Sequence, residues 1–240
     1  MSDTDIGAIG AAAPGQIGAV TPGHIGAAAP GRYGAAGPEN HGAARAGVVL
    51  AQATIAAALN VQGNPANAGF VAETHAMFGA PLPLEPNTTT RSAASTIVWL
   101  GPRSWLVLQG SAGTPAERTS ADGQSAPTGV DAQRDALLAQ GGALFDVTAS
   151  RVAFTIRGPH AATVLAAQCP LDFDPRAFQP SRCAQSLLGH INVLVCRHSH
   201  PQAFTVLVAR SMADDAWHGL CVAAASAGYE VAPTVPLDIA

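Results

Sequence analysis

The sequence predicts an α+β fold with a largely antiparallel sheet and packed helices. Three observations favour it. Strand-like runs come in pairs around short polar turns, helix-like stretches interrupt these pairs irregularly, and the order from residue 95 is ββ-α-ββ-α-βββ-α-β. A parallel α/β sheet needs strands and helices in regular alternation, so this order favours hairpins with helices packed against them.

Residues 1–45 differ from the rest in composition. From Ala13 to Ala44 the chain divides into four eight-residue units rich in Gly, Ala and Pro. Each unit holds at most one large apolar side chain, so the units cannot build a core, and their glycine spacing excludes collagen. We therefore predict a disordered tail over 1–45 and a folded domain over 46–240. An adhesive or partner-binding tail is the alternative.

The segment from residue 46 to 92 carries weak signals. "AGVVLAQATIAAALNV" (Ala46–Val61) is apolar for 16 residues, which is short of the roughly 20 that span a bilayer. We predict a small Ala-rich helix there and no membrane span. Residues 62–92 are predicted to be loop-like, because the prolines of "APLPLEPNTTT" (Ala80–Thr90) favour extended or turned backbone.

The first clear element is "STIVWLGPRSWLVLQ" (Ser95–Gln109), where two β-rich runs flank a Gly-Pro turn and predict a hairpin. Residues 110–129 are small and polar, which is typical of a flexible inserted loop. A helix follows, with Asp131 as its amino-terminal cap, Leu137 and Leu138 facing inward, and Gly141 at its end.

The stretch Ala143–Gly158 alternates like one or two strands, with Phe154 and Ile156 on one face. A helix is predicted next, with Pro159 at its first position. Its inner face carries Val164 and Leu165.

The carboxyl-terminal part predicts three strands and a helix. Two strands surround Gly189-His190 within Ala184–His198, and a third covers Ala203–Arg210. The final helix is predicted to begin at Ser211 in a capping box with Asp214 and to end at Gly228.

The composition excludes several classes of chemistry. All twelve basic residues are Arg, so the chain has no Lys for a phosphate-binding loop or a Schiff base. The net charge is −4 with no basic block, which argues against nucleic-acid and anionic-membrane partners. The chain has no CxxC pair and no secretory signal, so we expect free thiols in the cytoplasm. The cysteines are Cys169, Cys183, Cys196 and Cys221.

Two constellations could carry chemistry. "CRHSH" places Cys196, His198 and His200 on one strand face, which could hold a soft metal ion, but a fourth ligand has no candidate. Cys183 or Cys169 could act as a nucleophile if a histidine such as His160 or His190 lay beside it, and nothing in the sequence pairs them. These alternatives lead to no prediction of a catalytic or metal site.

The acidic pair Asp172 and Asp174 could perform acid–base catalysis, although Asp beside Pro is typical of turns. Trp99 and Trp105 on the hairpin indicate core or an interface. The arginines of "RAFQPSR", Arg176 and Arg182, could bind a carboxylate or contact a partner.

Four motifs in order resemble the gamma subunits of heterotetrameric sarcosine oxidases. They are "VWLGPRSWLVL" (Val98–Leu108), the pattern GP-A--VL---CPLD over Gly158–Asp172, "PRAF-P-RCAQ" over Pro175–Gln185, and "FTVLVARSMADDAW" (Phe204–Trp217). The resemblance covers about residues 75–231. The stretch "FDVTASRVAFTIRGPHAATVL" is also similar to the aminomethyltransferase superfamily, which implies an α+β fold like the folate-binding domain of those proteins.

The resemblance implies a non-catalytic subunit. Sarcosine oxidases of this type contain alpha, beta, gamma and delta subunits and demethylate sarcosine to glycine, giving hydrogen peroxide and methylene-tetrahydrofolate. FAD, FMN, NAD and tetrahydrofolate are then expected in the partner subunits and no cofactor in this chain. The candidate subunit-interface residues are Trp99, Trp105, Phe173, Arg176, Phe178 and Arg182.

Departures from the family leave alternatives open. Arg103-Ser104 stands where the family has an acidic pair, and Ala149 where the aminomethyltransferases often have His. A stand-alone folate-dependent aminomethyltransferase-like protein would need a pocket with a carboxylate, for which Asp146 is the candidate. A scaffold protein that acts through the repeat is the third hypothesis.

Overall fold

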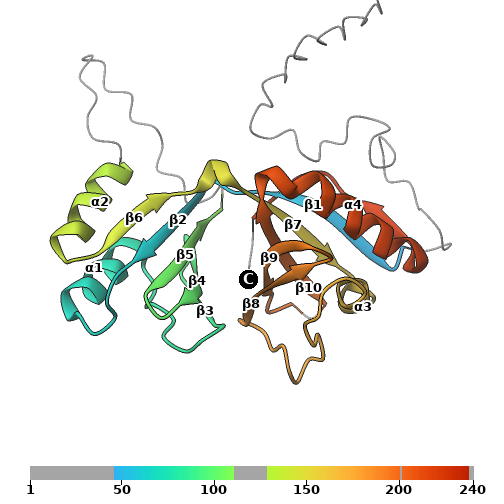
Figure 1. Ribbon diagram of the computed structural model, residues 1–240, viewed down its shortest axis with the longest axis horizontal. Coiled ribbons are helices and arrows are strands. Elements are labelled where there is room, and N and C mark those ends of the chain that lie inside the picture. Colours follow the sequence, from blue (N-terminus) through green and yellow to red (C-terminus); the bar gives the residue numbers. More distant parts are fainter. Residues whose placement is uncertain (1–45, 111–128, 201, 238–240) are drawn as a thin grey trace, which may run out of the picture.

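A computed structural model describes residues 46–110, 129–200 and 202–237. They form two β-sheets that lie side by side, with helices over one face of each (Figure 1). The predicted tail over 1–45 lies outside the described residues, as does nearly all of the inserted loop predicted over 110–129, so both stay predictions.

The larger sheet has seven strands, in the order β11-β1-β7-β10-β9-β8, with β12 also paired to β1. Only β11 and β12 run parallel to their neighbour β1, and the other pairs are antiparallel. The strands are β1 (Val48–Thr54), β7 (Arg151–Arg157), β8 (Cys183–Leu188), β9 (Ile191–Arg197), β10 (Ala203–Ala209), β11 (Tyr229–Val231) and β12 (Val235–Pro236).

The smaller sheet has five strands, all antiparallel, in the order β3-β4-β5-β2-β6. Its strands are β2 (Ala57–Gln62), β3 (Thr89–Arg91), β4 (Ser95–Gly101), β5 (Ser104–Gln109) and β6 (Ala143–Asp146). The chain passes from the larger to the smaller sheet between β1 and β2 and returns between β6 and β7, so the two sheets belong to one fold.

Apolar packing divides into three layers. Helices α1 (Ala68–Phe78) and α2 (Gly129–Ala139) pack on the smaller sheet, and α3 (Ala161–Ala166) and α4 (Ala213–Ala224) pack on the larger one. The faces turned away from the helices meet in a third cluster, the inter-sheet core, which contains Leu106, Leu194 and Leu207. Short 3₁₀ turns are η2 (Thr148–Ser150), η3 (Arg210–Met212) and η4 (Ala225–Ala227).

The predicted α+β class is confirmed, and so is the element order from residue 95 through α4, after which two short strands, β11 and β12, follow in place of the one predicted. The hairpin is β4–β5, where Trp99 pairs with Trp105. Phe154 and Ile156 both lie in the core under α3 and α4. Strands β8, β9 and β10 appear where the alternating runs predicted them.

The helix predicted over Ala46–Val61 is wrong, because this segment forms β1 and β2. Strand β1 lies between β11 and β7, and β2 lies between β5 and β6, so both are interior strands. Their backbone groups gain ladder partners on two sides, and this tertiary pairing outweighs the helix propensity of alanine.

The loop predicted over residues 62–92 is wrong in part, because it contains helix α1 and strand β3. The Asn67 side chain accepts hydrogen bonds from the backbone N–H groups of Gly69 and Phe70. Gly79 ends the helix in the left-handed region, with φ +70°. Both capping signals are visible in the sequence, but the helix between them has no strong apolar periodicity to draw attention to it.

Three predicted helix ends differ in detail. Asp131 lies inside the first turn of α2 and pairs with Arg134 at 2.6 Å, so it is not the cap. Pro159 precedes the His160 cap of α3, and Ser211 belongs to η3, which lies before α4.

On α2, Leu137 is buried as predicted, whereas Leu138 is 66% exposed. Adjacent helical residues point about 100° apart, so only one of them faces the sheet.

Removal of the Asn67 side chain is expected to weaken α1. Asn67→Ala deletes the cap and also the hydrogen bond from its amide to the Gln140 carbonyl, 2.8 Å long. The free energy of unfolding should fall by about 1–2 kcal/mol, measured by urea denaturation. Asn67→Ser keeps a capping oxygen and should recover about half of the loss. Equal losses in the two variants would contradict a capping role.

Candidate functional site

The segment between α3 and β8, residues 167–182, carries the CPLD and PRAF motifs and folds into a loop at the end of the larger sheet. We call it the motif loop. Its two phenylalanines are buried and meet Phe204 of β10. The ring of Phe173 lies edge-on to Phe204 at 5.5 Å, and Phe178 stacks on Phe204 at 6.4 Å. The motif is therefore held by an aromatic cluster.

Arg197 of β9 contacts the same loop. Its guanidinium donates to the Phe178 carbonyl and lies 5.8 Å from the centre of the Phe204 ring. The side chain is buried, so the hydrogen bond and the cation–π contact replace part of the water that this cation loses. Arg197 thus joins the motif loop to the sheet.

Turn hydrogen bonds shape the exposed side of the loop. Asp172 accepts from the backbone N–H of Asp174, and Asp174 accepts from that of Arg176. The Arg176 guanidinium also binds the Asp174 carboxylate through two nitrogens, at 2.9 and 3.0 Å. This contact lowers the pKa of Asp174 and raises that of Arg176. The acidic pair therefore serves the turn, as the neighbouring prolines indicated.

The candidate interface residues fall into two groups. Trp105, Phe173 and Phe178 are 0%, 5% and 6% exposed, so direct contact with a partner is closed to them in this conformation. Trp99 is half-buried and Arg176 and Arg182 reach the surface. The interface role of all six stays a prediction, and in this conformation the second group offers the exposed surface.

The structure adds surface residues that the sequence reasoning missed. Trp99 lines a shallow cavity of 420 Å³ with Leu84, Pro86 and Pro102, and Leu84 is 62% exposed. We call this the Leu84–Trp99 patch. Arg182 borders it, because its guanidinium pairs with Glu85 at 2.8 Å. The three prolines of "APLPLEP" were the available signal, since they favour an extended or turned surface segment, and Leu84 lies just before the turn at Pro86.

The nucleophile alternative gains no support. No hydrogen bond joins Cys169 or Cys183 to a histidine within the described ranges, and Cys169 instead contacts Ser186 at 3.5 Å. Burial raises the pKa of Cys183 to about 12. The thiol therefore stays protonated near neutral pH, whereas a cysteine nucleophile needs the thiolate.

The alternative of a metal site at Cys196, His198 and His200 also gains no support. Cys196 and His198 are buried, and His198 Nε2 lies 2.7 Å from the Thr205 hydroxyl. His200 lies beyond the end of β9 on an exposed bend. In the part of the chain that the structure describes, no three His, Cys, Asp or Glu side chains group in a way that could hold a metal ion.

The buried thiols predict an alkaline loss of stability. Unfolded Cys183 releases its proton near pH 9, while folded Cys183 keeps it until about pH 12. Above pH 9 the folded state therefore binds more protons, and the free energy of unfolding falls with rising pH by up to ~1.4 kcal/mol per pH unit for this thiol. Urea denaturation at increasing alkaline pH measures the slope. Cys183→Ala should give a shallower slope, and an unchanged slope would contradict this assignment.

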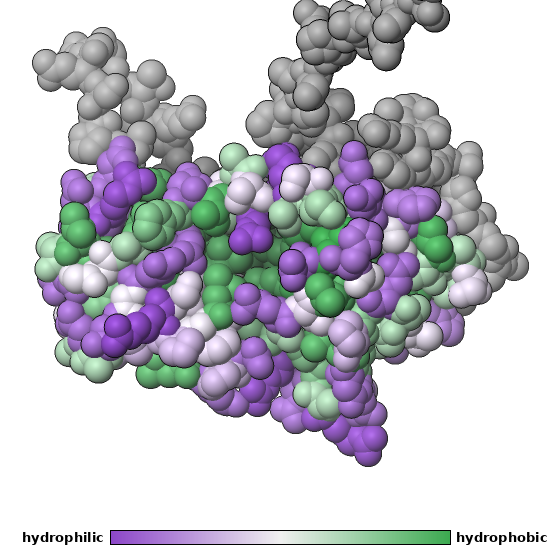
Figure 2. Space-filling model, viewed as in Figure 1, coloured by the Kyte–Doolittle hydropathy of each residue, from purple (hydrophilic) through white to green (hydrophobic). Residues whose placement is uncertain are grey.

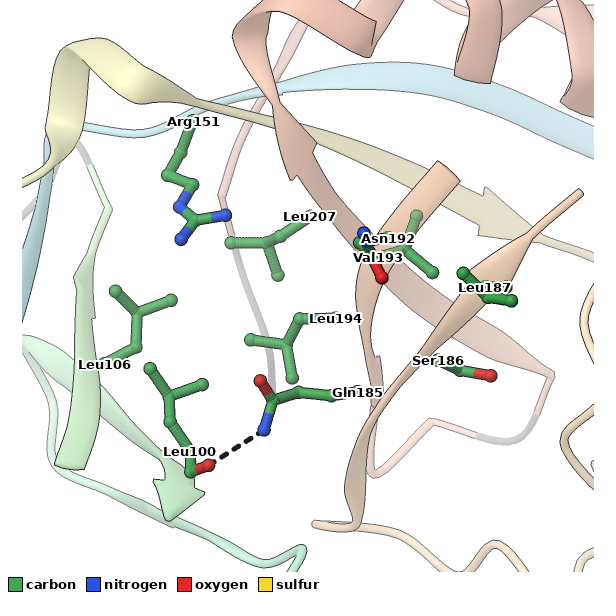
Figure 3. A pocket seen from close by; sticks show the side chains of 10 residues that line it. All are labelled: Leu100, Leu106, Arg151, Gln185, Ser186, Leu187, Asn192, Val193, Leu194 and Leu207. Carbon is green, nitrogen blue, oxygen red and sulfur yellow. Dashed lines mark hydrogen bonds between the residues drawn. The ribbon is translucent and has the colours of Figure 1, made fainter. Parts of the chain in front are cut away.

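Two cavities of the fold lie next to the inter-sheet core. One cavity of 540 Å³ opens between the sheets and is lined by leucines and Arg151, as Figure 3 shows. A second, of 600 Å³, includes Asp146, Gln52 and the same Arg151. Asp146 thus lines a pocket, although one of its oxygens already accepts the Thr148 N–H at 2.9 Å.

None of the helices in the described ranges combines the length and apolar character that crossing a membrane requires.

Comparison with known proteins gives one consistent family. No protein-family model matches the chain. The sarcosine oxidase subunit gamma of Corynebacterium sp. (strain P-1) is 29% identical over 180 residues, 73% of this chain and 79% of the relative. The sarcosine oxidase subunit gamma of Arthrobacter sp. is 30% identical over 154 residues, 62% of this chain and 67% of the relative.

Solved structures agree with this. A chain of the heterotetrameric sarcosine oxidase from Corynebacterium sp. U-96, in complex with pyrrole 2-carboxylate, matches with a TM-score of 0.63 and 26% identity, over 78% of this chain and 89% of that one. The glycine cleavage system aminomethyltransferase T from Bartonella henselae shares the fold, with a TM-score of 0.50 and 14% identity over 79% of this chain and 48% of that one. The predicted aminomethyltransferase-like fold is thereby confirmed. The relatives, the shared fold and the motif loop lead to one assignment: this chain belongs to the sarcosine oxidase gamma subunit family.

Proposed function

We propose that this chain is the non-catalytic gamma subunit of a heterotetrameric sarcosine oxidase. Alpha, beta and delta subunits complete the complex and oxidatively demethylate sarcosine to glycine, with formation of hydrogen peroxide and methylene-tetrahydrofolate. The observation that carries the proposal is the match over 89% of a chain from a solved heterotetrameric sarcosine oxidase. In this proposal FAD, FMN, NAD and tetrahydrofolate belong to the partner subunits, and the complex is cytoplasmic.

The role of this chain in the complex is structural. It offers partners the Leu84–Trp99 patch, where an exposed leucine, a half-buried tryptophan and prolines form an apolar centre. The Arg182–Glu85 pair lies at the edge of that centre. An apolar centre with a charged rim is the usual composition of a subunit interface. Arg176, exposed on the motif loop, is a further contact in this proposal.

Co-expression tests the proposal. The full chain, tagged for capture, is produced with candidate alpha, beta and delta subunits, with and without residues 1–45. We expect flavin-bearing subunits to co-purify and the complex to form peroxide when sarcosine is added. Both versions of the chain should behave alike if the tail is dispensable. A chain that captures no flavin-bearing subunit would contradict the subunit role.

Two leucine variants locate the interface. Leu84→Asp places a charge in the Leu84–Trp99 patch and should reduce capture of the partners about tenfold or more, because a buried unpaired charge is costly. Leu138→Asp is the matched control, since Leu138 is 66% exposed on α2 and does not line the patch. Equal capture by the two variants, with wild-type capture intact, would move the interface elsewhere and leave the subunit role standing.

The pocket with Asp146 supports a second candidate function, a stand-alone folate-dependent aminomethyltransferase-like protein. A carboxylate in a pocket is what recognition of a pterin ring requires. Titration of the isolated full chain with tetrahydrofolate distinguishes the two candidates. Binding by the wild type that Asp146→Asn abolishes, together with no capture of partners, would favour the folate protein.

A further inference from the structure

The 540 Å³ cavity between the sheets has an apolar floor and a single charged side chain. Its floor is formed by Leu100 and Leu106 from the smaller sheet and by Leu194 and Leu207 from the larger sheet. Figure 2 shows hydrophobic residues gathered in the hollow between the two halves of the molecule. A volume of this size with leucine walls is typical of small-molecule pockets.

Arg151, at the start of β7, is the charged lining residue. In Figure 3 its guanidinium points into the space between Leu106 and Leu207. Nε is fully buried and donates to no partner, so the terminal nitrogens are the groups that can face the cavity. Within the described ranges, this side chain makes no ion pair with any carboxylate.

The charged neighbours of Arg151 are Arg210 and, in the adjoining 600 Å³ cavity that Arg151 also lines, Asp146, with which it forms no ion pair. Arg210 lies next to the backbone of this segment, because its guanidinium donates to the carbonyls of Ala149, at 2.5 Å, and of Arg151, at 3.5 Å. The other polar side chains at the cavity are the uncharged Gln185, Ser186 and Asn192, and Gln185 is held by its hydrogen bond to the Leu100 carbonyl, 2.8 Å long. No acidic side chain lines this cavity. An arginine that faces an apolar pocket and is not paired with a carboxylate is a recognition element for an anion.

We propose that this cavity binds a small organic monocarboxylate with an apolar body, whose carboxylate meets the terminal nitrogens of Arg151. A carboxylate fits better than a phosphate ester, because one guanidinium fork satisfies the two oxygens of a planar carboxylate. The leucine floor then buries an aliphatic or aromatic body. The site belongs to this chain alone, so the proposal does not depend on the subunit role.

Calorimetric titration of the full chain tests the proposal. The probes are benzoate and hexanoate, each compared with its uncharged analogue, benzamide or hexanamide. We expect at least one carboxylate to bind about tenfold or more tightly than its amide. Arg151→Met keeps most of the side-chain length and should abolish that difference. Arg157→Met is the matched control, since Arg157 is exposed at the other end of the same strand.

A second variant covers the case in which Arg151→Met does not fold. Asn192 is exposed at the wall of the cavity, and Asn192→Trp should fill the space and weaken carboxylate binding without removing any charge. Absence of binding by both carboxylates, or equal binding of acid and amide, would overturn the proposal. So would a finding that Arg151→Met leaves binding unchanged but prevents capture of partner subunits, which would make the cavity a protein contact.

Discussion

Phe204→Ala is expected to lower the free energy of unfolding by about 3–5 kcal/mol. Phe204 is 1% exposed and contacts both phenylalanines of the motif loop, in addition to the Arg197 guanidinium. Alanine would leave a cavity where three rings meet and would remove the ring that faces the buried cation. Domains of this size are stable by about 5–15 kcal/mol, so the loss is a large share of the total.

Phe145→Ala is the matched control for this prediction. Phe145 lies on β6 and is 50% exposed, so its truncation should change the free energy of unfolding by about 1 kcal/mol or less. Urea denaturation of the full chain measures both variants. Similar losses at the two positions would show that the aromatic cluster does not stabilise the fold as we describe.

Gly158→Ala is expected to cost about 3 kcal/mol or more, from backbone strain and a clash together. Gly158 has φ +124°, a conformation that residues with a Cβ rarely adopt. A Cβ there would lie 2.6 Å from the Gly47 carbonyl oxygen and 3.1 Å from the Val48 Cα. Both atoms are backbone at the start of β1, which is paired to β7 in the register Val49 to Arg157, so neither can move without disturbing the sheet.

Gly101→Ala serves as the control for the glycine. A Cβ at Gly101 meets no atom within 4 Å, and its φ is not in the left-handed region. We expect its effect to stay within about 1 kcal/mol. Thermal unfolding followed by circular dichroism measures both variants, and a Gly158→Ala variant as stable as Gly101→Ala would refute the close approach of Gly158 to the start of β1.

The close contact at Gly158 also explains why the family motif GP-A begins with glycine. The chain leaves β7 and turns toward α3 where β1 passes within contact, and only glycine leaves room there. In the motif loop that follows, the motif residues also make contacts within the fold. Its phenylalanines face inward to Phe204, while its aspartates hold the turns. The motif residues whose contacts we describe therefore preserve the fold.

The sequence predicted the candidate site only in part. It singled out Trp99, Arg176 and Arg182, which reach the surface, but also Phe173 and Phe178, which are buried. The sequence pattern around an aromatic loop residue is the same whether its side chain faces a partner or the core. For Leu84 the flanking prolines were a weak signal, and for Arg151 there was none, because exposure and the lack of an ion pair depend on which segments pack around a residue.

By itself, the sequence determined the fold class, the strand and helix order from residue 95 through α4, and the family. Alternating apolar residues, bounded by turn residues, encode strands such as β8 and β9, and this local signal does not depend on the tertiary context. Only the tertiary structure decided that Ala46–Val61 forms two strands, that the sheets face each other across a leucine core, and that Arg151 opens into the cavity there. The physical reason is that alanine-rich backbone and lone arginines have no strong local preference, so their state depends on partners far away in the chain.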